Sequence, residues 1–321
     1  HYVATCVGYV GKAGEITASA ENCQIKIALQ KAPASSYGTG ITSDWPDFRG
    51  GTDNNGLVSA KTPIESEKAM LSWATKLGNS YGSGATGCPI LITQDGWDYV
   101  VAYAGNSIVK VDALSGKVVA SGIMKTNSSF AINSATYGGG MIFVALSGGC
   151  VQAFDARTLN PLWVYTDALG GQPNCPIVYR DGYLYTGFWN GEEKTQANFV
   201  CLTATDEVKG TDTEAKLPVW NCTVDGGFYW AGAYVGQNYL LVGTDDGAGG
   251  YTSPTGGLLC LDPRTGLEFD SLHDLVGDVR SSVSYDSGTD RYYFTSKGGY
   301  FYSVAVEAQD GGYRLTDLKS L

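Results

Sequence analysis

Short apolar stretches, each introduced by a turn, recur along most of the chain. Four of them share a turn residue such as Gly, Asp or Asn followed by a mostly apolar run: 139–145, 181–187, 237–243 and 290–295. None of these runs has the 3.6-residue period of an amphipathic helix, and their length suits buried β-strands. The pattern predicts an all-β protein built from short antiparallel strands.

Each apolar stretch is followed by another strand, and a recurring turn comes directly after that second strand. Three copies of it align around an Asp, at positions Asp112, Asp155 and Asp262. Thr203 and Ala305 hold the same column in two degenerate copies, so successive copies are 43 to 59 residues apart. Strand-only repeats of this length are typical of the four-stranded antiparallel blades of a β-propeller, and five of them are readable here.

Two residue types in the repeat are expected to have structural roles. Asp112, Asp155 and Asp262 each begin a turn, where an Asp side chain can bond the backbone two residues further on. Trp163 and Trp220 lie near the end of two repeats, where a large apolar ring would fill the space between neighbouring blades. We therefore expect these five residues to support the fold rather than to form a catalytic or metal site.

A segment of small residues separates a short N-terminal region from the repeats. Alternation predicts strands at 2–7 and 23–29 with a middle strand near 15–18, and so short a region cannot bury a core alone. The sequence thus predicts three parts: residues 1–33, the last strands of a β-sandwich module; residues 34–42, a linker; and residues 43–321, the propeller.

The repeats resemble a known family of propellers. Ala153, Asp155 and Thr158, followed by Trp163, resemble the Ala-x-Asp-x-x-Thr-Gly-x-x-x-Trp signature of the PQQ-like, or quinoprotein-type, β-propeller family. Residues 261–266 supply the same turn, and residues 44–50 resemble the Trp-Pro-x-Phe-Arg-Gly opening that precedes such propellers. The resemblance covers residues 43–321. Five readable repeats that end at Leu321 favour an incomplete set from a ring of six to eight blades, and a five-bladed ring or closure by a second chain are the alternatives.

The N-terminal region carries a second resemblance. Residues 8–12 and 25–29 resemble the last strands of the prealbumin-like or carboxypeptidase-regulatory-like β-sandwich modules found on bacterial surface proteins. This likeness implies a bacterial, extracellular, cell-surface location. It also favours a chain that begins inside a larger protein.

Catalytic chemistry has little support in the residues themselves. The quinone-dependent dehydrogenases of the family use Ca²⁺ with carboxylate and amide ligands, an Asp base and commonly an adjacent Cys pair, and no residue here can be matched to that set. The chain has two His, at 1 and 273, and no GxSxG or HExxH motif. We expect a protein that is not an enzyme and has no cofactor, with Ca²⁺ possible at Asp245 and Asp246 beside a glycine turn.

An aromatic group is the strongest candidate for a binding surface. Trp189 and the run Phe228, Tyr229 and Trp230 could pack in the core or lie exposed at the propeller face. Exposed rings of this kind bind sugars, planar cofactors or protein partners. The ligand would then be a protein partner, a glycan or a small molecule.

Composition narrows the class of partner. Of 321 residues, 44 are Gly, which suits a turn-rich chain, and a net charge of −11 repels nucleic acid and anionic membranes. No apolar stretch approaches the length of about 18 residues needed for membrane insertion.

The eight Cys include no CxxC pair, so structural zinc has no support. Two pairs are close enough in sequence to form local disulfides, Cys6 with Cys23 and Cys201 with Cys222. Buried free thiols are the alternative.

These observations favour a non-catalytic extracellular binding or scaffold protein that presents a propeller face to a ligand or partner. One alternative is an enzyme that holds a cofactor or metal on that face. Another is a subunit that self-assembles by adding its N-terminal strands to another chain.

Overall fold

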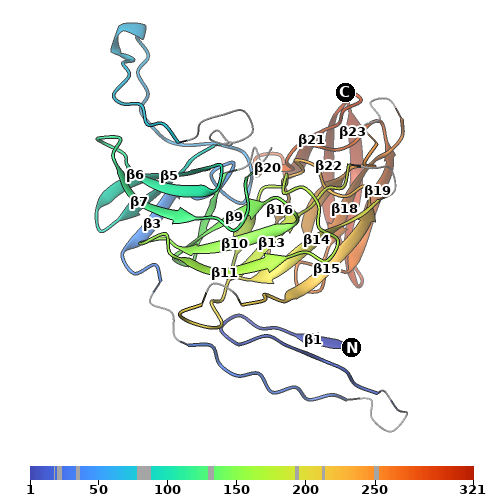
Figure 1. Cartoon of the computed structure of the whole chain (residues 1–321). Helices are drawn as coiled ribbons and strands as arrows, with labels where there is room; N and C mark the ends of the chain where they lie inside the picture. Colours follow the sequence, from blue (N-terminus) through green and yellow to red (C-terminus); the bar gives the residue numbers. More distant parts are fainter. Residues whose placement is uncertain are drawn as a thin grey trace.

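The described residues form six antiparallel β-sheets, a two-stranded N-terminal ribbon and five larger sheets that lie side by side in chain order (Figure 1). The computed structural model of the chain describes residues 1–17, 19, 24–33, 37–77, 88–128, 134–191, 195–211, 214–248 and 253–321. The helical element in these residues is a single 3-10 turn, Ser66–Lys68, and none of their helical segments is long and apolar enough to cross a lipid bilayer. The predicted all-β propeller architecture of four-stranded antiparallel blades is confirmed.

We number the five larger sheets as blades 1 to 5. Blade 1 contains β3 (Ile41–Trp45), β4 (Ile90–Gln94), β5 (Trp97–Ala104), β6 (Ser107–Asp112) and β7 (Val118–Ile123). Blade 2 contains β8 (Thr136–Gly138), β9 (Met141–Leu146), β10 (Cys150–Asp155) and β11 (Pro161–Thr166). Blade 3 contains β12 (Val178–Arg180), β13 (Tyr183–Gly187), β14 (Gln196–Thr203) and β15 (Pro218–Asp225).

The last two blades have the same order. Blade 4 contains β16 (Tyr234–Val235), β17 (Leu240–Thr244), β18 (Gly256–Leu261) and β19 (Glu268–Leu275). Blade 5 contains β20 (Ser284–Asp286), β21 (Arg291–Thr295), β22 (Phe301–Gln309) and β23 (Gly312–Ser320). In blades 2 to 5 each strand pairs with the next in sequence. β4 of blade 1 contacts β8, which contacts β12, so these three strands lie along the inner edge of blades 1 to 3.

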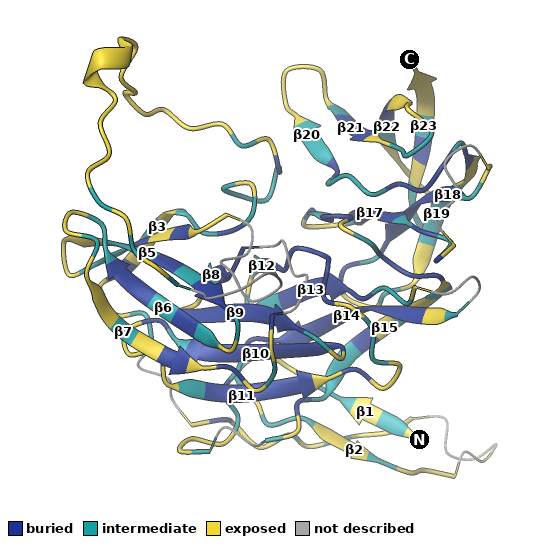
Figure 2. Ribbon diagram, turned by 45° about the horizontal axis from the view of Figure 1, so that its top comes forward, coloured by how far each residue is buried: buried dark blue, intermediate teal, exposed yellow. Residues whose placement is uncertain are grey.

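The hydrophobic core lies between blades rather than within one. The cluster around Ile108 and Phe154 joins blades 1 and 2, and the cluster around Trp163 and Leu184 joins blades 2 and 3. Because both faces of a central strand are covered, strands such as β9 are buried along their whole length, as Figure 2 shows. The continuous apolar runs of the sequence are the consequence of this two-sided burial.

The repeated Asp residues lie at the turn between the last two strands of their blades. The Asp112 carboxylate accepts the Ser115 backbone N–H at 2.6 Å, and the Asp155 carboxylate accepts the Arg157 backbone N–H at 2.7 Å. Asp262 accepts the backbone N–H of Arg264 at 2.8 Å. This is the geometry of the turn role expected for the three residues.

Residues 46–56 tie distant blades together. The Asn54 side-chain amide donates to the carbonyls of Ala233, at 2.8 Å, and Val283, at 3.0 Å. The Pro46 carbonyl accepts the Tyr137 backbone N–H at 2.7 Å. The Trp-Pro-x-Phe-Arg-Gly opening and the residues that follow it therefore link blade 2 to the entrances of blades 4 and 5.

The N-terminal region forms less sheet than its alternation predicts. β1 (Tyr2–Ala4) pairs with β2 (Lys12–Gly14), and the ribbon lies beside blade 3, where Gly8 N–H donates to Thr205 Oγ1 at 2.9 Å. The strand predicted at 23–29 is wrong for its described residues, 24–29, which belong to no sheet. β3 starts at Ile41, so its first two residues belong to the segment 34–42 that was predicted as a linker.

Candidate functional site

Side chains from consecutive connections meet at one end of blades 3 to 5. Trp189 follows β13, Tyr229 lies between β15 and β16, and Asp245 follows β17. Asp278 and Arg280 lie between β19 and β20. In an antiparallel blade, the connection from the second to the third strand and the connection to the next blade leave from the same end, so the topology gathers these five residues.

Backbone hydrogen bonds hold these connections together. Trp189 N–H donates to Gln172 O at 3.1 Å, and Phe228 N–H donates to Phe188 O at 2.9 Å. Asp245 N–H donates to Gly227 O at 2.9 Å, so single bridges run from one connection to the next. The side chains of the site therefore project from a paired backbone.

Asp245 is the centre of the cluster. Its side chain is 1% exposed, and Oδ1 accepts Trp189 Nε1 and the Gly247 backbone N–H, both at 2.8 Å. Its Oδ2 accepts Arg280 Nε in a short ion pair. The buried charge of Asp245 is thus compensated by hydrogen bonds and by one cation, as a buried carboxylate requires.

Arg280 lies against the aromatic rings. Its guanidinium carbon is 4.2 Å from the Tyr229 ring centroid and 5.9 Å from that of Trp189. The centroids of Trp189 and Tyr229 are 4.4 Å apart, and both residues are half-buried. The cation–π geometry fixes Arg280 over an accessible aromatic surface.

Asp278 is a second buried carboxylate with a different environment. Its side chain is 0% exposed, and it accepts Thr255 Oγ1 at 3.1 Å and the Asp246 backbone N–H at 3.3 Å. Lys297 Nζ lies 3.5 Å from its Oδ2. Burial, followed by the charges of Asp245 and Asp246, raises the pKa of Asp278 above its ordinary value, so it takes up a proton more readily than an exposed Asp.

The three Asp side chains resemble a cation site only in part. Oxygens of Asp245, Asp246 and Asp278 lie within 4.8 Å of one another, which suits the oxygen ligands of Ca²⁺. Arg280 bonds both Asp245 and Asp278, and Lys297 also pairs with Asp278. A divalent ion would have to displace these cations, so the residues as arranged do not fit a resident Ca²⁺.

The structure divides the predicted aromatic group. Trp189 and Tyr229 join the cluster, and Trp230 is 37% exposed with its ring centroid 4.3 Å from that of Tyr229. Phe228 is 0% exposed and packs 5.3 Å from Phe199 in the core between blades 3 and 4, so its place on a ligand surface was wrongly predicted. The backbone turns here, with positive φ at Gly226, Gly227 and Trp230, and this turn takes Tyr229 and Trp230 out of the core that holds Phe228.

Sequence reasoning found Asp245 but missed three other charged residues of the site. Asp278 and Arg280 lie outside the repeat, and Lys297 comes from blade 5. One signal could have found them: the connection 276–283 is equivalent to the connection 226–233 that carries Tyr229, and it places an Asp and an Arg two residues apart.

The predicted disulfide between Cys201 and Cys222 is absent, because both are free thiols. Cys201 pairs in register with Trp220, whereas Cys222 pairs with Phe199, so the two are not opposite each other. Burial raises the pKa of the Cys201 thiol, which makes it unreactive. Cys6 is a free, exposed thiol, and Cys23 lies outside the described residues.

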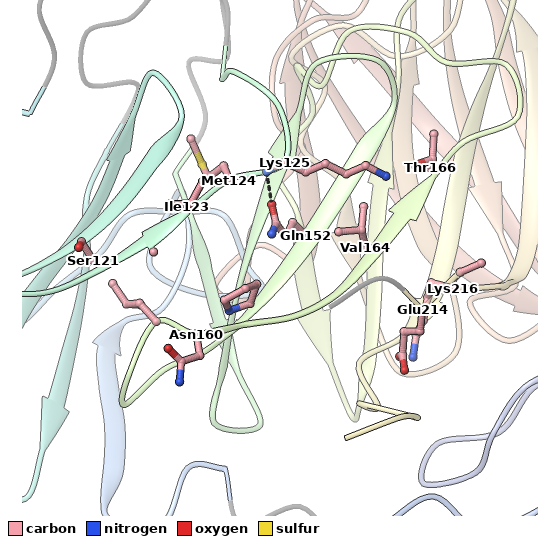
Figure 3. A pocket seen from close by; sticks show the side chains of 14 residues that line it. Ser121, Ile123, Met124, Lys125, Gln152, Asn160, Val164, Thr166, Glu214 and Lys216 are labelled. Atoms are coloured by element: carbon pink, nitrogen blue, oxygen red, sulfur yellow. Dashed lines mark hydrogen bonds between the residues drawn. The ribbon is translucent and has the colours of Figure 1, made fainter. Parts of the chain in front are cut away.

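A groove of about 770 Å³ lies elsewhere, between the outer strands of blades 1 and 2 (Figure 3). Ser121, Met124, Asn160 and Glu214 are among its lining residues, and Gln152 Oε1 accepts the Lys125 backbone N–H at 2.8 Å. The groove is separate from the cluster at Asp245.

Two comparisons with known proteins found nothing. No protein-family model matches the chain. None of the curated proteins matches it either.

Solved structures do resemble it. The quinohemoprotein alcohol dehydrogenase of Pseudomonas putida HK5 has a TM-score of 0.62 and 13% identity, over 86% of this chain and 48% of that chain. The quinohemoprotein alcohol dehydrogenase of Comamonas testosteroni has a TM-score of 0.62 and 14% identity, over 86% and 49%. A europium-containing methanol dehydrogenase has a TM-score of 0.61 and 13% identity, over 86% and 57%.

This likeness establishes the quinoprotein-like propeller fold, and the chain spans about half the length of the structures it resembles. It also overturns two expectations drawn from the sequence, that the protein is not an enzyme and that it has no cofactor. The three similar structures named above are quinohemoprotein alcohol dehydrogenases and a methanol dehydrogenase, which are enzymes.

Proposed function

We propose that the chain is the propeller part of a cofactor-dependent oxidoreductase, with Trp189, Tyr229, Asp245 and Arg280 binding a planar cofactor of the quinone class. The observation that carries the proposal is the buried Asp245 carboxylate, held between Trp189 Nε1 and Arg280 beside accessible aromatic rings. The names of the similar structures support the cofactor class.

The residues fit such a group. A planar ring can stack on Trp189 or Tyr229, and the Arg280 guanidinium can pair with a carboxylate or a quinone oxygen. When bound, a quinone accepts two electrons and two protons from an alcohol, which becomes a carbonyl compound. Asp245 holds Arg280 and the Trp189 ring in place, and Asp278 can hold a proton because of its raised pKa.

Cofactor binding by this chain tests the proposal. Pyrroloquinoline quinone should quench the tryptophan fluorescence of the purified protein, and alcohols should then reduce an artificial dye. Trp189→Ala and Arg280→Gln should each weaken quinone binding at least tenfold. Trp97→Ala is the matched control, because Trp97 is 63% exposed and lies on blade 1. Absence of quinone binding, or equal binding by all three variants, would refute the proposal.

We also infer an extracellular location at a bacterial cell surface, where a protein, a glycan or a small molecule would be the partner. The acidic, sparsely charged composition and the likeness of the N-terminal region to surface modules support it. Labelling of intact cells with a membrane-impermeant amine reagent tests it, and a protein that is labelled only after lysis would contradict it.

A further inference from the structure

The groove between blades 1 and 2 exists because the outer strand of blade 1 lacks bulky side chains. By strand register, Ala120 of β7 stands where β11 has Trp163 and β15 has Trp220. Gly122 is also small, and a Cβ there would lie 2.3 Å from the Leu159 carbonyl oxygen. Blades 2 and 3 fill this place with their own rings, whereas blade 1 leaves a space of about 770 Å³, a size that suits a small organic ligand.

Two of the three charged side chains that line the groove are already engaged. The Glu214 carboxylate accepts the backbone N–H groups of Glu207 and Val208, at 3.2 and 2.6 Å. Lys216 Nζ donates to Glu207 Oε1 at 2.9 Å and to Thr205 O. Both side chains therefore hold the connection that follows β14 in place, and neither is free to bind a ligand.

The other polar residues of the groove include two donors that are not engaged, on Gln152 and Lys125. Gln152 is 3% exposed, and its Oε1 accepts the Lys125 backbone N–H at 2.8 Å (Figure 3). Its amide nitrogen, Nε2, has no hydrogen-bond partner among the described residues, and a buried polar group without a partner costs free energy. Lys125 is exposed, and its ammonium forms no ion pair within the described part of the chain. The groove therefore offers two uncompensated donors, one of which is charged.

The two donors lie beside an apolar wall. Figure 3 shows the Lys125 side chain extending along the groove toward β11. Its backbone is bonded to the Gln152 amide and its four-carbon stem is flexible, so the ammonium can swing to meet a group held by Gln152. Met124, Pro161 and Val164 supply apolar surface next to them. This arrangement suits a ligand with one anionic end and an apolar body.

We propose that this groove binds a carboxylate that carries an apolar body, which is the chemistry of a medium-chain fatty acid. One carboxylate oxygen accepts a hydrogen bond from Gln152 Nε2, and the other pairs with the Lys125 ammonium. The apolar body lies against Met124 and Val164. A single free cation favours a monoanion, because a doubly charged phosphate would lack a second counter-charge beside Glu214, in a chain of net charge −11.

NMR of the purified chain with isotope-labelled Met methyl groups tests the proposal. The chain has three Met: Met124 lines the groove, Met141 belongs to the core between blades 2 and 3, and Met70 is 82% exposed. Decanoate, kept below its micelle concentration, should shift the Met124 signal in a saturable way and leave the other two signals unchanged. Decanol, which has the same carbon chain without the charge, should bind at least tenfold more weakly.

Variants of the two donors test the carboxylate contacts. Lys125→Gln should weaken decanoate binding at least tenfold and leave decanol binding unchanged, because only the ion pair is lost. Lys117→Gln is the matched control, because Lys117 is exposed and precedes β7 as Lys125 follows it, but it does not line the groove. Gln152→Glu retains the acceptor for the Lys125 backbone N–H and removes the donor, so it should also weaken decanoate binding at least tenfold.

A last variant fills the groove. Ala215 is exposed and lines the groove, so Ala215→Trp should abolish the binding of both ligands without disturbing the core. The proposal is overturned by the absence of a saturable shift at Met124, by equal affinity for decanoate and decanol, or by unchanged decanoate affinity of the Lys125→Gln chain. A shift confined to Met70 would reveal adsorption to exposed apolar residues and would overturn it too.

Discussion

The junctions between blades 3 and 4 and between blades 1 and 2 use the same repeat positions with different side chains. In the first, Trp220 on the outer strand packs on Gly266 in the turn. In the second, the strand register places Ala120 where Trp220 stands, and Leu159 is the turn residue that corresponds to Gly266. The large side chain therefore comes from the outer strand at the junction of blades 3 and 4, and from the turn at the junction of blades 1 and 2.

A large side chain in the turn strains the backbone of the turn, and the small residues opposite it leave a groove. Leu159 is 0% exposed and has φ +60°, a conformation that costs a non-Gly residue about 1–2 kcal/mol. It lies beside Ala120 and Gly122, whose small size leaves the groove between the two outer strands. An apolar side chain must thus fill the centre of a blade junction, and either the outer strand or the turn can provide it.

Removal of the large ring should have the greatest effect. Trp220→Ala should lower the free energy of unfolding by about 3–5 kcal/mol, because a buried Trp is lost and a cavity remains. Urea denaturation followed by circular dichroism measures this. Trp97→Ala, at a 63% exposed position, should change stability by less than about 0.5 kcal/mol. Equal losses in the two variants would contradict the role of Trp220 at the junction.

Filling the turn beneath the ring should have the next largest effect. Gly266→Ala should cost about 2–4 kcal/mol, since it adds left-handed strain and a clash with Trp220. Gly299→Ala is the matched control, because Gly299 has φ +84° and nothing within 4 Å of its Cβ position. The same denaturation experiment measures both, and the control should show the strain alone.

A double-mutant cycle can convert one junction into the other. Ala120→Trp should clash with Leu159, and Leu159→Gly should relieve the clash by recreating the Trp and Gly pair. We expect a favourable coupling free energy of about 1–3 kcal/mol between the two changes. Additive effects would show that positions 120 and 159 do not share the same space.

The smallest effect concerns pH at the junction of blades 1 and 2. Lys110 is 3% exposed there, and its Nζ donates to Gln94 Oε1 at 2.8 Å and to Ala156 O at 3.2 Å. Burial lowers the pKa of Lys110 in the folded state. The unfolded chain therefore binds the proton more readily, and stability should rise with pH between that lowered pKa and about 10.4, the ordinary value.

Comparison with Lys110→Met isolates this contribution. The difference in unfolding free energy between the native chain and this variant should shift in favour of the native chain as pH increases toward 10. A difference that does not depend on pH would contradict the assignment of the lowered pKa to Lys110.

Much of the architecture was predictable because its signals are local. The Asp that begins each turn and the apolar run before it report on their own strand, whatever lies across the blade. The strand predicted at 23–29 failed in its described part because alternation describes one face, whereas a strand also needs a neighbour for its backbone.

The candidate site was predictable only as separate pieces. The sequence marks Trp189, Tyr229 and Asp245 by residue type and by glycine-rich surroundings, but it places them 16 to 56 residues apart. Their convergence, and the addition of Asp278 and Arg280, depend on the order and stacking of the blades.

The amino-acid sequence alone establishes the blade repeat, its turns and the positions of its Trp and Gly residues, because these features depend on neighbours a few residues away. The packing of one blade on the next decides which rings are buried and which carboxylates meet a cation. Those properties depend on distances between residues far apart in the sequence, and no local pattern encodes such distances.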